Sequence, residues 1–143
     1  LFRSAADVWP ALELGAEPAG LLLADPQGQL QFMAASDERT EWLELFQVQS
    51  HEGPCQDCFL EGQPVINADL RAAVDRWPQF APRAVAAGFR SVHAFPMRLR
   101  QDVIGALNLL SDTAGQFTET DEAIVASVQR VGLPALLKPA AGA

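Results

Sequence analysis

The alternation of apolar and polar residues predicts two antiparallel hairpins, with helices between and around them. An apolar run over residues 21–24 reaches an Asp-Pro-Gln-Gly turn at residues 25–28, and apolar residues then alternate over residues 30–34. Pro presets φ at the second position of such a turn, and Gly accepts a positive φ at its last position. The second hairpin joins residues 89–99 to residues 103–110, and its last strand is apolar throughout, as expected for a strand buried on both faces.

Residues 38–48 have the spacing of an amphipathic helix. Its apolar side, which we expect in the core, comprises Trp42, Leu43, Leu45 and Phe46. Its acidic side, which we expect in solvent, comprises Glu38, Glu41 and Glu44. Trp77 also falls at core spacing, in a later turn, so Trp42 and Trp77 are predicted to be core residues.

Shorter elements fill the space between the hairpins. Pro54 suits the first turn of a short helix that Gly62 ends, residues 64–66 predict a short strand, and Pro78 opens a helix that Gly88 ends. Apolar residues at helical spacing also predict helices over residues 2–14 and from about residue 118 to residue 131.

This order of elements predicts the fold class. Two hairpins and one isolated strand give a central antiparallel sheet of about five strands flanked by helices, which is an α+β arrangement. We divide the 143 residues into an N-terminal helical segment (1–17), one domain (18–133) and a tail or linker (134–143).

Composition and charge narrow the function classes. The chain has 10 Lys and Arg against 18 Asp and Glu, a net charge of −8, which argues against binding nucleic acid or an anionic membrane. No apolar run has the length of a membrane span, and no signal peptide is visible. Two cysteines cannot make a secreted disulfide framework, so we expect a cytoplasmic location.

Three motifs carry a resemblance to a known family. They are residues 88–97 (Gly-Phe-Arg-Ser-Val-His-Ala-Phe-Pro-Met), residues 103–109 (Val-Ile-Gly-Ala-Leu-Asn-Leu) and residues 117–122 (Phe-Thr-Glu-Thr-Asp-Glu). With the order of elements, they resemble the GAF domain family of small-molecule sensor modules. The resemblance implies a PAS-related fold with a ligand pocket on one face of the sheet and terminal helices, which often dimerise, on the other.

A further motif narrows the resemblance. Residues 52–58 (Glu-Gly-Pro-Cys-Gln-Asp-Cys) together with Arg76, Trp77 and Pro78 resemble the GAF domains that precede an RNA-binding ANTAR domain in actinobacterial antiterminators. Residues 133–143 are too short to form an ANTAR domain, so we expect no RNA binding by this 143-residue chain.

We therefore expect a non-catalytic sensor domain that binds an unknown small ligand beside the sheet. It would relay the change through its terminal helices to a transcription-antitermination output. Apolar stripes in those helices, such as Val8 with Leu12 and Ile124 with Val128, predict a homodimer. No catalytic residue, metal or cofactor is predicted.

The pocket is expected beside the second hairpin. Alternation places His93 and Phe95 on one strand face, and the helices that carry Trp42 and Cys55 are the predicted lids. The predicted lining consists of Phe32, Trp42, Phe46, Cys55, Cys58, His93 and Phe95.

Cys55 and Cys58 allow more than one interpretation. At i and i+3 on a helix, both thiols lie on one side, and the helix start favours thiolate, which allows a redox sensor. They are also consistent with structural thiols, or with two zinc ligands if His51 and His93 complete the set. An enzyme such as free methionine sulfoxide reductase, which has a GAF-like fold, is a rival, although its cysteine pattern finds no match here. A domain used only for dimerisation is a third reading.

Overall fold

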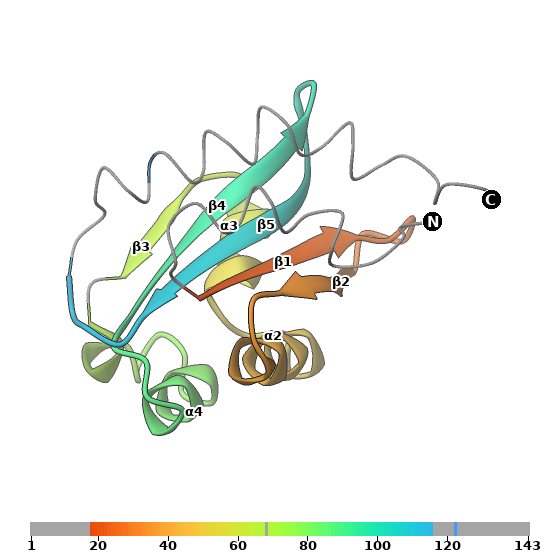
Figure 1. Ribbon diagram of the computed structural model, residues 1–143. Coiled ribbons are helices and arrows are strands. Elements are labelled where there is room, and N and C mark those ends of the chain that lie inside the picture. Colours follow the sequence, from red (N-terminus) through yellow and green to blue (C-terminus); the bar gives the residue numbers. More distant parts are fainter. Residues whose placement is uncertain (1–17, 68, 116–121, 123–143) are drawn as a thin grey trace.

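A computed structural model describes residues 18–67, 69–115 and 122 of the chain. Within them lies one antiparallel sheet of five strands in the order β2-β1-β5-β4-β3 (Figure 1). The strands are β1 (Ala19–Ala24), β2 (Leu30–Ala35), β3 (Val65–Asn67), β4 (Ser91–Leu99) and β5 (Asp102–Ser111). The predicted α+β class, with about five antiparallel strands in two hairpins and one isolated strand, is confirmed.

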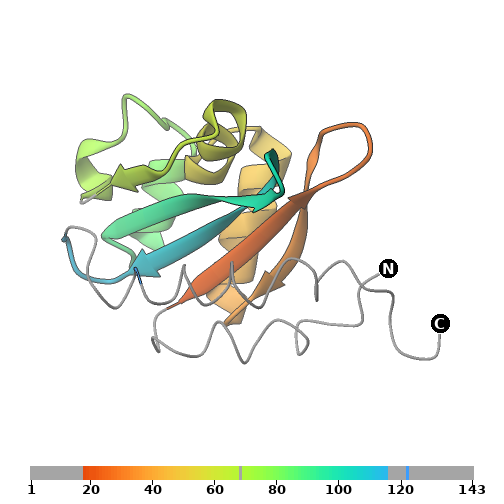
Figure 2. The same cartoon turned by 90° about the horizontal axis from the view of Figure 1, so that it is seen from above.

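In the part of the chain that the structure describes, three helices cover one face of this sheet (Figures 1 and 2). They are α2 (Glu38–Ser50), α3 (Pro54–Glu61) and α4 (Phe80–Ala86), and the short 3-10 turn η3 (Leu70–Ala72) precedes α4. Helix α2 packs on β1 and β2, α3 packs on β4 and β5, and α4 packs against α2 and η3. None of the helices in the described part of the chain is long and apolar enough to cross a membrane. The predicted terminal helices, with the apolar stripes expected to support dimerisation, lie outside the described residues.

Local sequence signals explain where these elements begin and end. The Asp37 side chain accepts a hydrogen bond of 2.7 Å from the Thr40 amide and so caps α2. Pro54 occupies the first turn of α3, where its missing N–H costs nothing, and Gly62 ends that helix with a φ of 69°.

Strand register decides which side chains meet the helices. Leu22 of β1 lies opposite Ala106 of β5, and both belong to a buried cluster beneath the helices. That cluster also contains Val92 and Ala94 of β4, with the buried side chains of Cys55, Cys58, Trp77 and Phe80. Because neighbouring residues of a strand point to opposite faces, His93, Phe95 and Met97 face away from α2, α3 and α4.

Helix α2 is rotated relative to the sequence prediction. Its buried positions are Thr40, Leu43, Glu44 and Gln47, whereas Trp42 is 67% exposed. The expectation that Trp42 lies in the core and Glu44 in solvent is therefore wrong. The physical reason is that β5 supplies a hydrogen-bonding partner for Glu44 and α3 supplies one for Gln47, so a mainly polar face can be buried there.

Trp42 and Trp77 should therefore differ sharply in their contribution to stability. Trp77 is 1% exposed, and its ring meets Phe80 edge to face at 6.0 Å. Trp77→Ala should lower the free energy of unfolding by about 3–5 kcal/mol, the cost of a large cavity. Trp42→Ala should change it by no more than about 0.5 kcal/mol, the usual range for surface positions. Urea unfolding measures both, and similar losses for the two variants would contradict the observed orientation of α2.

Candidate functional site

A buried carboxyl group lies between α2 and the sheet. The Asn108 Nδ2 atom of β5 donates a hydrogen bond of 2.6 Å to Glu44 Oε1, and Gln47 Nε2 donates one of 3.3 Å to the same oxygen. All three side chains are fully buried. These contacts tie one face of α2 to the middle of the sheet.

Gly20 makes the space for this carboxyl group. It lies opposite Asn108 in the β1–β5 register, at the point where α2 crosses the sheet. A Cβ atom at position 20 would lie only 2.7 Å from Glu44 Cγ, so any larger residue would displace the acid. The glycine is required here for close packing and not for an unusual φ.

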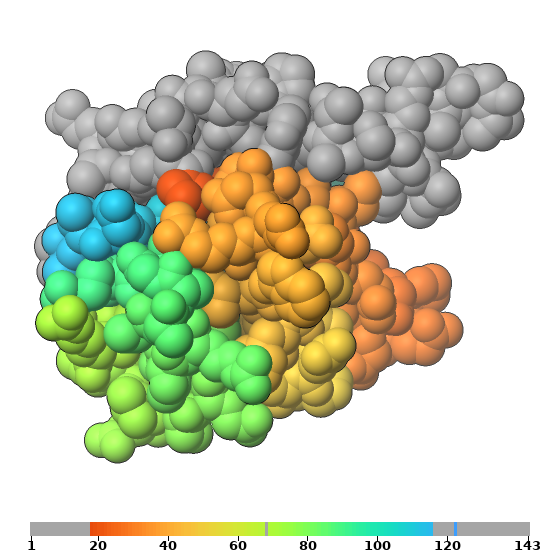
Figure 3. All heavy atoms as spheres, turned by 60° about the horizontal axis from the view of Figure 1, so that its bottom comes forward, coloured from red at the N-terminus to blue at the C-terminus, as the bar shows by residue number. Residues whose placement is uncertain are grey.

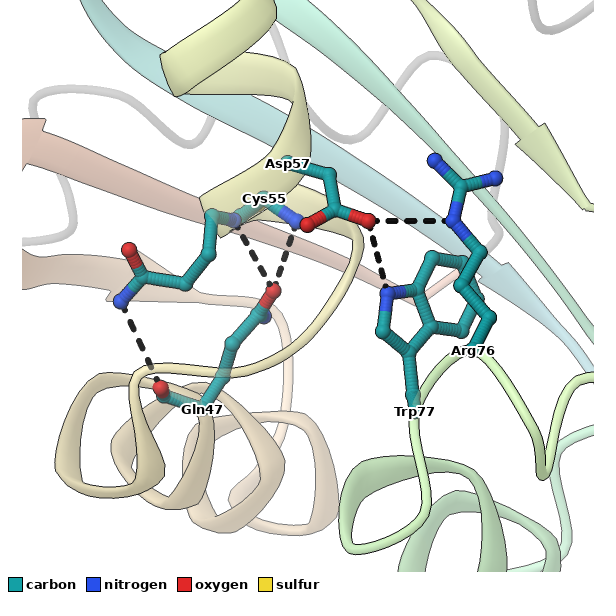
Figure 4. A network of polar contacts seen from close by, with 6 residues as sticks. Gln47, Cys55, Asp57, Arg76 and Trp77 are labelled. Carbon is teal, nitrogen blue, oxygen red and sulfur yellow. Dashed lines mark hydrogen bonds and ion pairs between the residues drawn. The ribbon is translucent and has the colours of Figure 1, made fainter.

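Gln47 extends the network to α3 (Figure 4). Its Oε1 atom accepts a hydrogen bond of 2.6 Å from the Cys55 amide, one of the otherwise unpaired amides at the start of α3. Gly53 has a φ of 141°, and a Cβ atom there would collide with the Gln47 side chain. The loop before α3 is therefore shaped around Gln47.

Burial sets the protonation of this cluster. Desolvation raises the pKa of Glu44 to about 7, and the hydrogen bond from Asn108 offsets part of the rise. Desolvation also raises the pKa of Cys55 well above its usual value, with a further contribution from the charge of Glu44. Burial and the neighbouring Glu61 raise the pKa of Cys58 to about 12. The thiolate-favouring effect expected from the helix start is thus outweighed.

Three oxygen atoms near Glu44 remain available for hydrogen bonding. Glu44 Oε2, Asn108 Oδ1 and Thr40 Oγ1 are buried and have no hydrogen-bond partner among the described residues. An unsatisfied buried polar atom costs about 1–3 kcal/mol. Protonation of Glu44 would remove the buried charge and so lower the cost of burying this carboxyl group.

The motif at residues 52–58 forms a clamp between helices. Glu52 Oε1 accepts hydrogen bonds of 2.7 Å from the amides of Gln79 and Phe80, where α4 begins. Asp57 Oδ2 accepts bonds of 3.1 Å from Arg76 Nε and 2.9 Å from Trp77 Nε1 (Figure 4). The acids of this motif therefore join α3 and its preceding loop to the segment that leads into α4.

The predicted pocket residues do not come together. Cys55 and Cys58 lie in the core beneath the helices, and Phe32 packs against that core. His93 and Phe95 lie on the other face of the sheet, so the expectation that they face α2 and α3 is wrong. The physical reason is that both faces of β4 are apolar, and its alternation does not reveal which face the helices cover. Trp42 and Phe46 lie elsewhere again, on α2.

A groove of about 680 Å³ runs between α2 and α4. Its lining is Glu38, Arg39, Trp42, Leu43, Leu45, Phe46, Gln49, Arg83 and Ala87. The two helices form neighbouring parts of the surface in Figure 3, with α4 in green. Of the seven predicted pocket residues, Trp42 and Phe46 belong to this lining. Among the described residues, no group of three or more His, Cys, Asp and Glu is arranged to hold a metal ion.

Sequence reasoning missed Thr40, Glu44, Gln47 and Asn108. The first three repeat with Leu43 at i, i+3, i+4 and i+7, which is the spacing of a buried helix face. Asn108 interrupts the apolar run of β5, and a polar residue in such a run is the one available signal that its face meets a polar partner.

Comparisons with known proteins agree on the fold. A family model described as GAF domain matches residues 8–130. A type II free methionine-R-sulfoxide reductase from Thermoplasma acidophilum is 19% identical, with a TM-score of 0.64 over 92% of this chain and 87% of that one. A GAF domain/HD domain protein from Geobacter sulfurreducens is 15% identical, with a TM-score of 0.66 over 90% and 88%.

A third similar structure is the GAF domain of an Acinetobacter phosphoenolpyruvate-protein phosphotransferase. It is 15% identical, with a TM-score of 0.59 over 92% of this chain and 76% of that one. No curated protein matches the sequence. At these identities the structural likeness concerns the fold alone.

Glu44 should make stability fall as pH rises. Its pKa is about 7 in the folded protein against a usual value of 4.5. Between pH 4.5 and about pH 7, the folded state therefore keeps a proton that the unfolded state has lost. The free energy of unfolding should therefore decrease by about 3 kcal/mol from pH 4.5 to pH 8 through this group.

Urea unfolding at several pH values tests this expectation. Glu44→Gln should remove that part of the pH dependence, and Glu41→Gln, an exposed acid of the same helix, should keep it. Identical pH profiles for wild type and Glu44→Gln would show that Glu44 titrates normally.

Proposed function

We propose that this chain, which belongs to the GAF domain family, is a non-catalytic regulatory domain that binds a small ligand and relays the change through its terminal segments. The observation that supports this proposal is the position of Glu44. It joins α2 to Asn108 of β5 and packs on Gly20 of β1. A shift of α2 would therefore act directly on both strands.

These two strands are the ones that continue into the ends of the chain. Strand β1 begins at Ala19, shortly after residues 1–17, and β5 ends at Ser111, before residues 112–143. They also pair with each other in the middle of the sheet. A ligand that binds one position of α2 more tightly than another would shift this equilibrium by its difference in affinity. The shift would pass through Glu44 to both terminal segments.

The proposed output is transcription antitermination. Support for it comes from the resemblance of residues 52–58 and 76–78 to GAF domains that precede an ANTAR domain. The clamp formed by Glu52 and Asp57 gives those motif residues a role in holding α3 and α4 in place. In this interpretation the motif maintains the helix layer, and α2 is the element that responds.

The relay can be tested without knowing the ligand, because the ionisation of Glu44 itself perturbs α2. Between pH 6 and pH 8, amide exchange corrected for intrinsic rates should change in α2, in β1 and β5, and in the adjoining terminal segments. Glu44→Gln should abolish this change, and Glu41→Gln should retain it. Hydrogen exchange followed by mass spectrometry measures all of these segments at once. A change confined to α2 would contradict the relay.

A second candidate function is reduction of free methionine sulfoxide. Cys55 and Cys58 lie on one helix, in the core between that helix and the sheet, with Cys55 close to Glu44. Reductases of this kind are among the similar structures. Such chemistry, like a redox sensor built on the same pair, needs a thiolate. The raised pKa values of Cys55 and Cys58 favour protonated structural thiols instead.

Thiol labelling and turnover distinguish these functions. At pH 8 iodoacetamide should label Cys55 and Cys58 at least 100-fold more slowly in the folded protein than in urea, because both are buried and protonated. Free methionine-R-sulfoxide supplied with dithiothreitol should not be reduced. Fast labelling of Cys55, with turnover that Cys55→Ser abolishes, would favour the reductase. Peroxide-dependent loss of both thiols without turnover would favour the redox sensor.

A further inference from the structure

The groove between α2 and α4 combines an aromatic wall with two cationic side chains. Trp42 is 67% exposed there, and Leu45 and Phe46 are half-buried beside it. We propose that this groove binds a small aromatic anion, an aryl carboxylate or sulfonate, which stacks on Trp42 and pairs with Arg83 and Arg39. The proposed binding rests on the groove alone. The idea that the bound ligand is the signal rests in addition on the proposed function.

The size of the groove favours a small molecule. Its volume of about 680 Å³ falls within the roughly 300–1,000 Å³ of small-molecule sites. Helix α4 has seven residues, so its flank is about 10 Å long. A partner helix of three turns would extend about 16 Å and leave much of its apolar face uncovered. The flat, exposed face of Trp42 instead suits one planar ring system.

Charge selects an anion. The Arg83 guanidinium carbon lies 4.3 Å from the centre of the Phe46 ring, and that of Arg39 lies 3.9 Å from the centre of the Phe89 ring. Arg39 Nη1 also donates a hydrogen bond of 3.0 Å to the Ala87 carbonyl. Both cations are therefore held in position with further N–H donors available, which lowers the entropic cost of binding.

Neither cation is neutralised by the part of the chain that the structure describes. The ion pairs among those residues are Arg76–Asp57 and Arg90–Asp69, and Glu38 is the single carboxylate in the groove lining. The groove thus carries two cations and one anion in a chain whose net charge is −8. A guanidinium binds a carboxylate or sulfonate through charge-assisted hydrogen bonds, which are stronger than neutral ones.

The two faces of α2 connect this groove to the buried carboxyl group. Trp42, Phe46 and Gln49 face the groove, while Thr40, Glu44 and Gln47 face the sheet. A ligand that wedges between α2 and α4 would therefore act on the helix that holds Glu44 against Asn108. This is the input that the proposed relay requires.

Two dyes with the same ring system separate stacking from charge. Anilinonaphthalene sulfonate carries the anion, and phenyl-naphthylamine is its neutral counterpart. The full chain should bind the sulfonate at one saturable site. Trp42→Ala should weaken both dyes at least tenfold, whereas Arg83→Gln should weaken the sulfonate about tenfold and the neutral dye less than twofold.

Matched controls lie outside the groove. Leu60→Ala, at another exposed apolar position, and Arg71→Gln, at an exposed arginine, should leave both affinities unchanged. Urea unfolding confirms that each variant is folded. Loss of dye binding in Leu60→Ala, equal losses of both dyes in Arg83→Gln, or absence of saturable binding would overturn the proposal. The proposal would also be overturned if the protein released the dye when its mass doubled at higher protein concentration. That result would assign the groove to a second copy of the chain.

Amide exchange with and without the sulfonate distinguishes this site from the relay. Slower exchange in α2, β1 and β5 on dye binding supports both the binding site and its use as the signal. Specific dye binding with no effect on β1 and β5 supports the site and contradicts its use as the signal. Absence of dye binding, while pH still changes exchange in β1 and β5, overturns the site and leaves the relay intact.

Discussion

The contact between Glu44 and Asn108 is the interaction on which the position of α2 depends. A carboxyl group that leaves water for the protein interior pays a desolvation cost of several kcal/mol. Hydrogen bonds from Asn108 and Gln47 offset part of that cost, and Gly20 leaves the space that the side chain needs. The remaining cost raises the pKa of Glu44 to about 7. Gln47 in turn binds the Cys55 amide, so the placement of α3 depends on the same acid.

The cysteine pair and the acidic motif are both engaged in the packing of the helix layer. Glu52 and Asp57 use their oxygens to hold backbone amides and the Arg76–Trp77 turn. Burial makes Cys55 and Cys58 packing residues with raised pKa values. The proposed function places the response at the carboxyl group of Glu44, which lies on the sheet side of α2, opposite the groove.

Sequence patterns predicted the elements well and their orientation poorly. The two hairpins and the short helix between Pro54 and Gly62 are specified by the chemistry of neighbouring residues, and the sequence predicted them. Whether Trp42 or Glu44 faces the core depends on Gly20 and Asn108, which lie far away in sequence. In the same way, His93 and Val92 both sit in an apolar strand, and only the covering helices determine which of them meets Cys55. The site could not be predicted because its partners are brought together by sheet register.

The most direct test of this account is the ionisation of Glu44 itself. The carboxyl carbon of Glu44 can be followed by NMR against pH in protein labelled with carbon-13 at glutamate, with Glu44→Gln identifying the resonance. The account predicts a midpoint near pH 7 for this carboxyl group. A midpoint near 4.5, the usual value for glutamate, would show that Glu44 is exposed to water and that α2 is not held on the sheet through it.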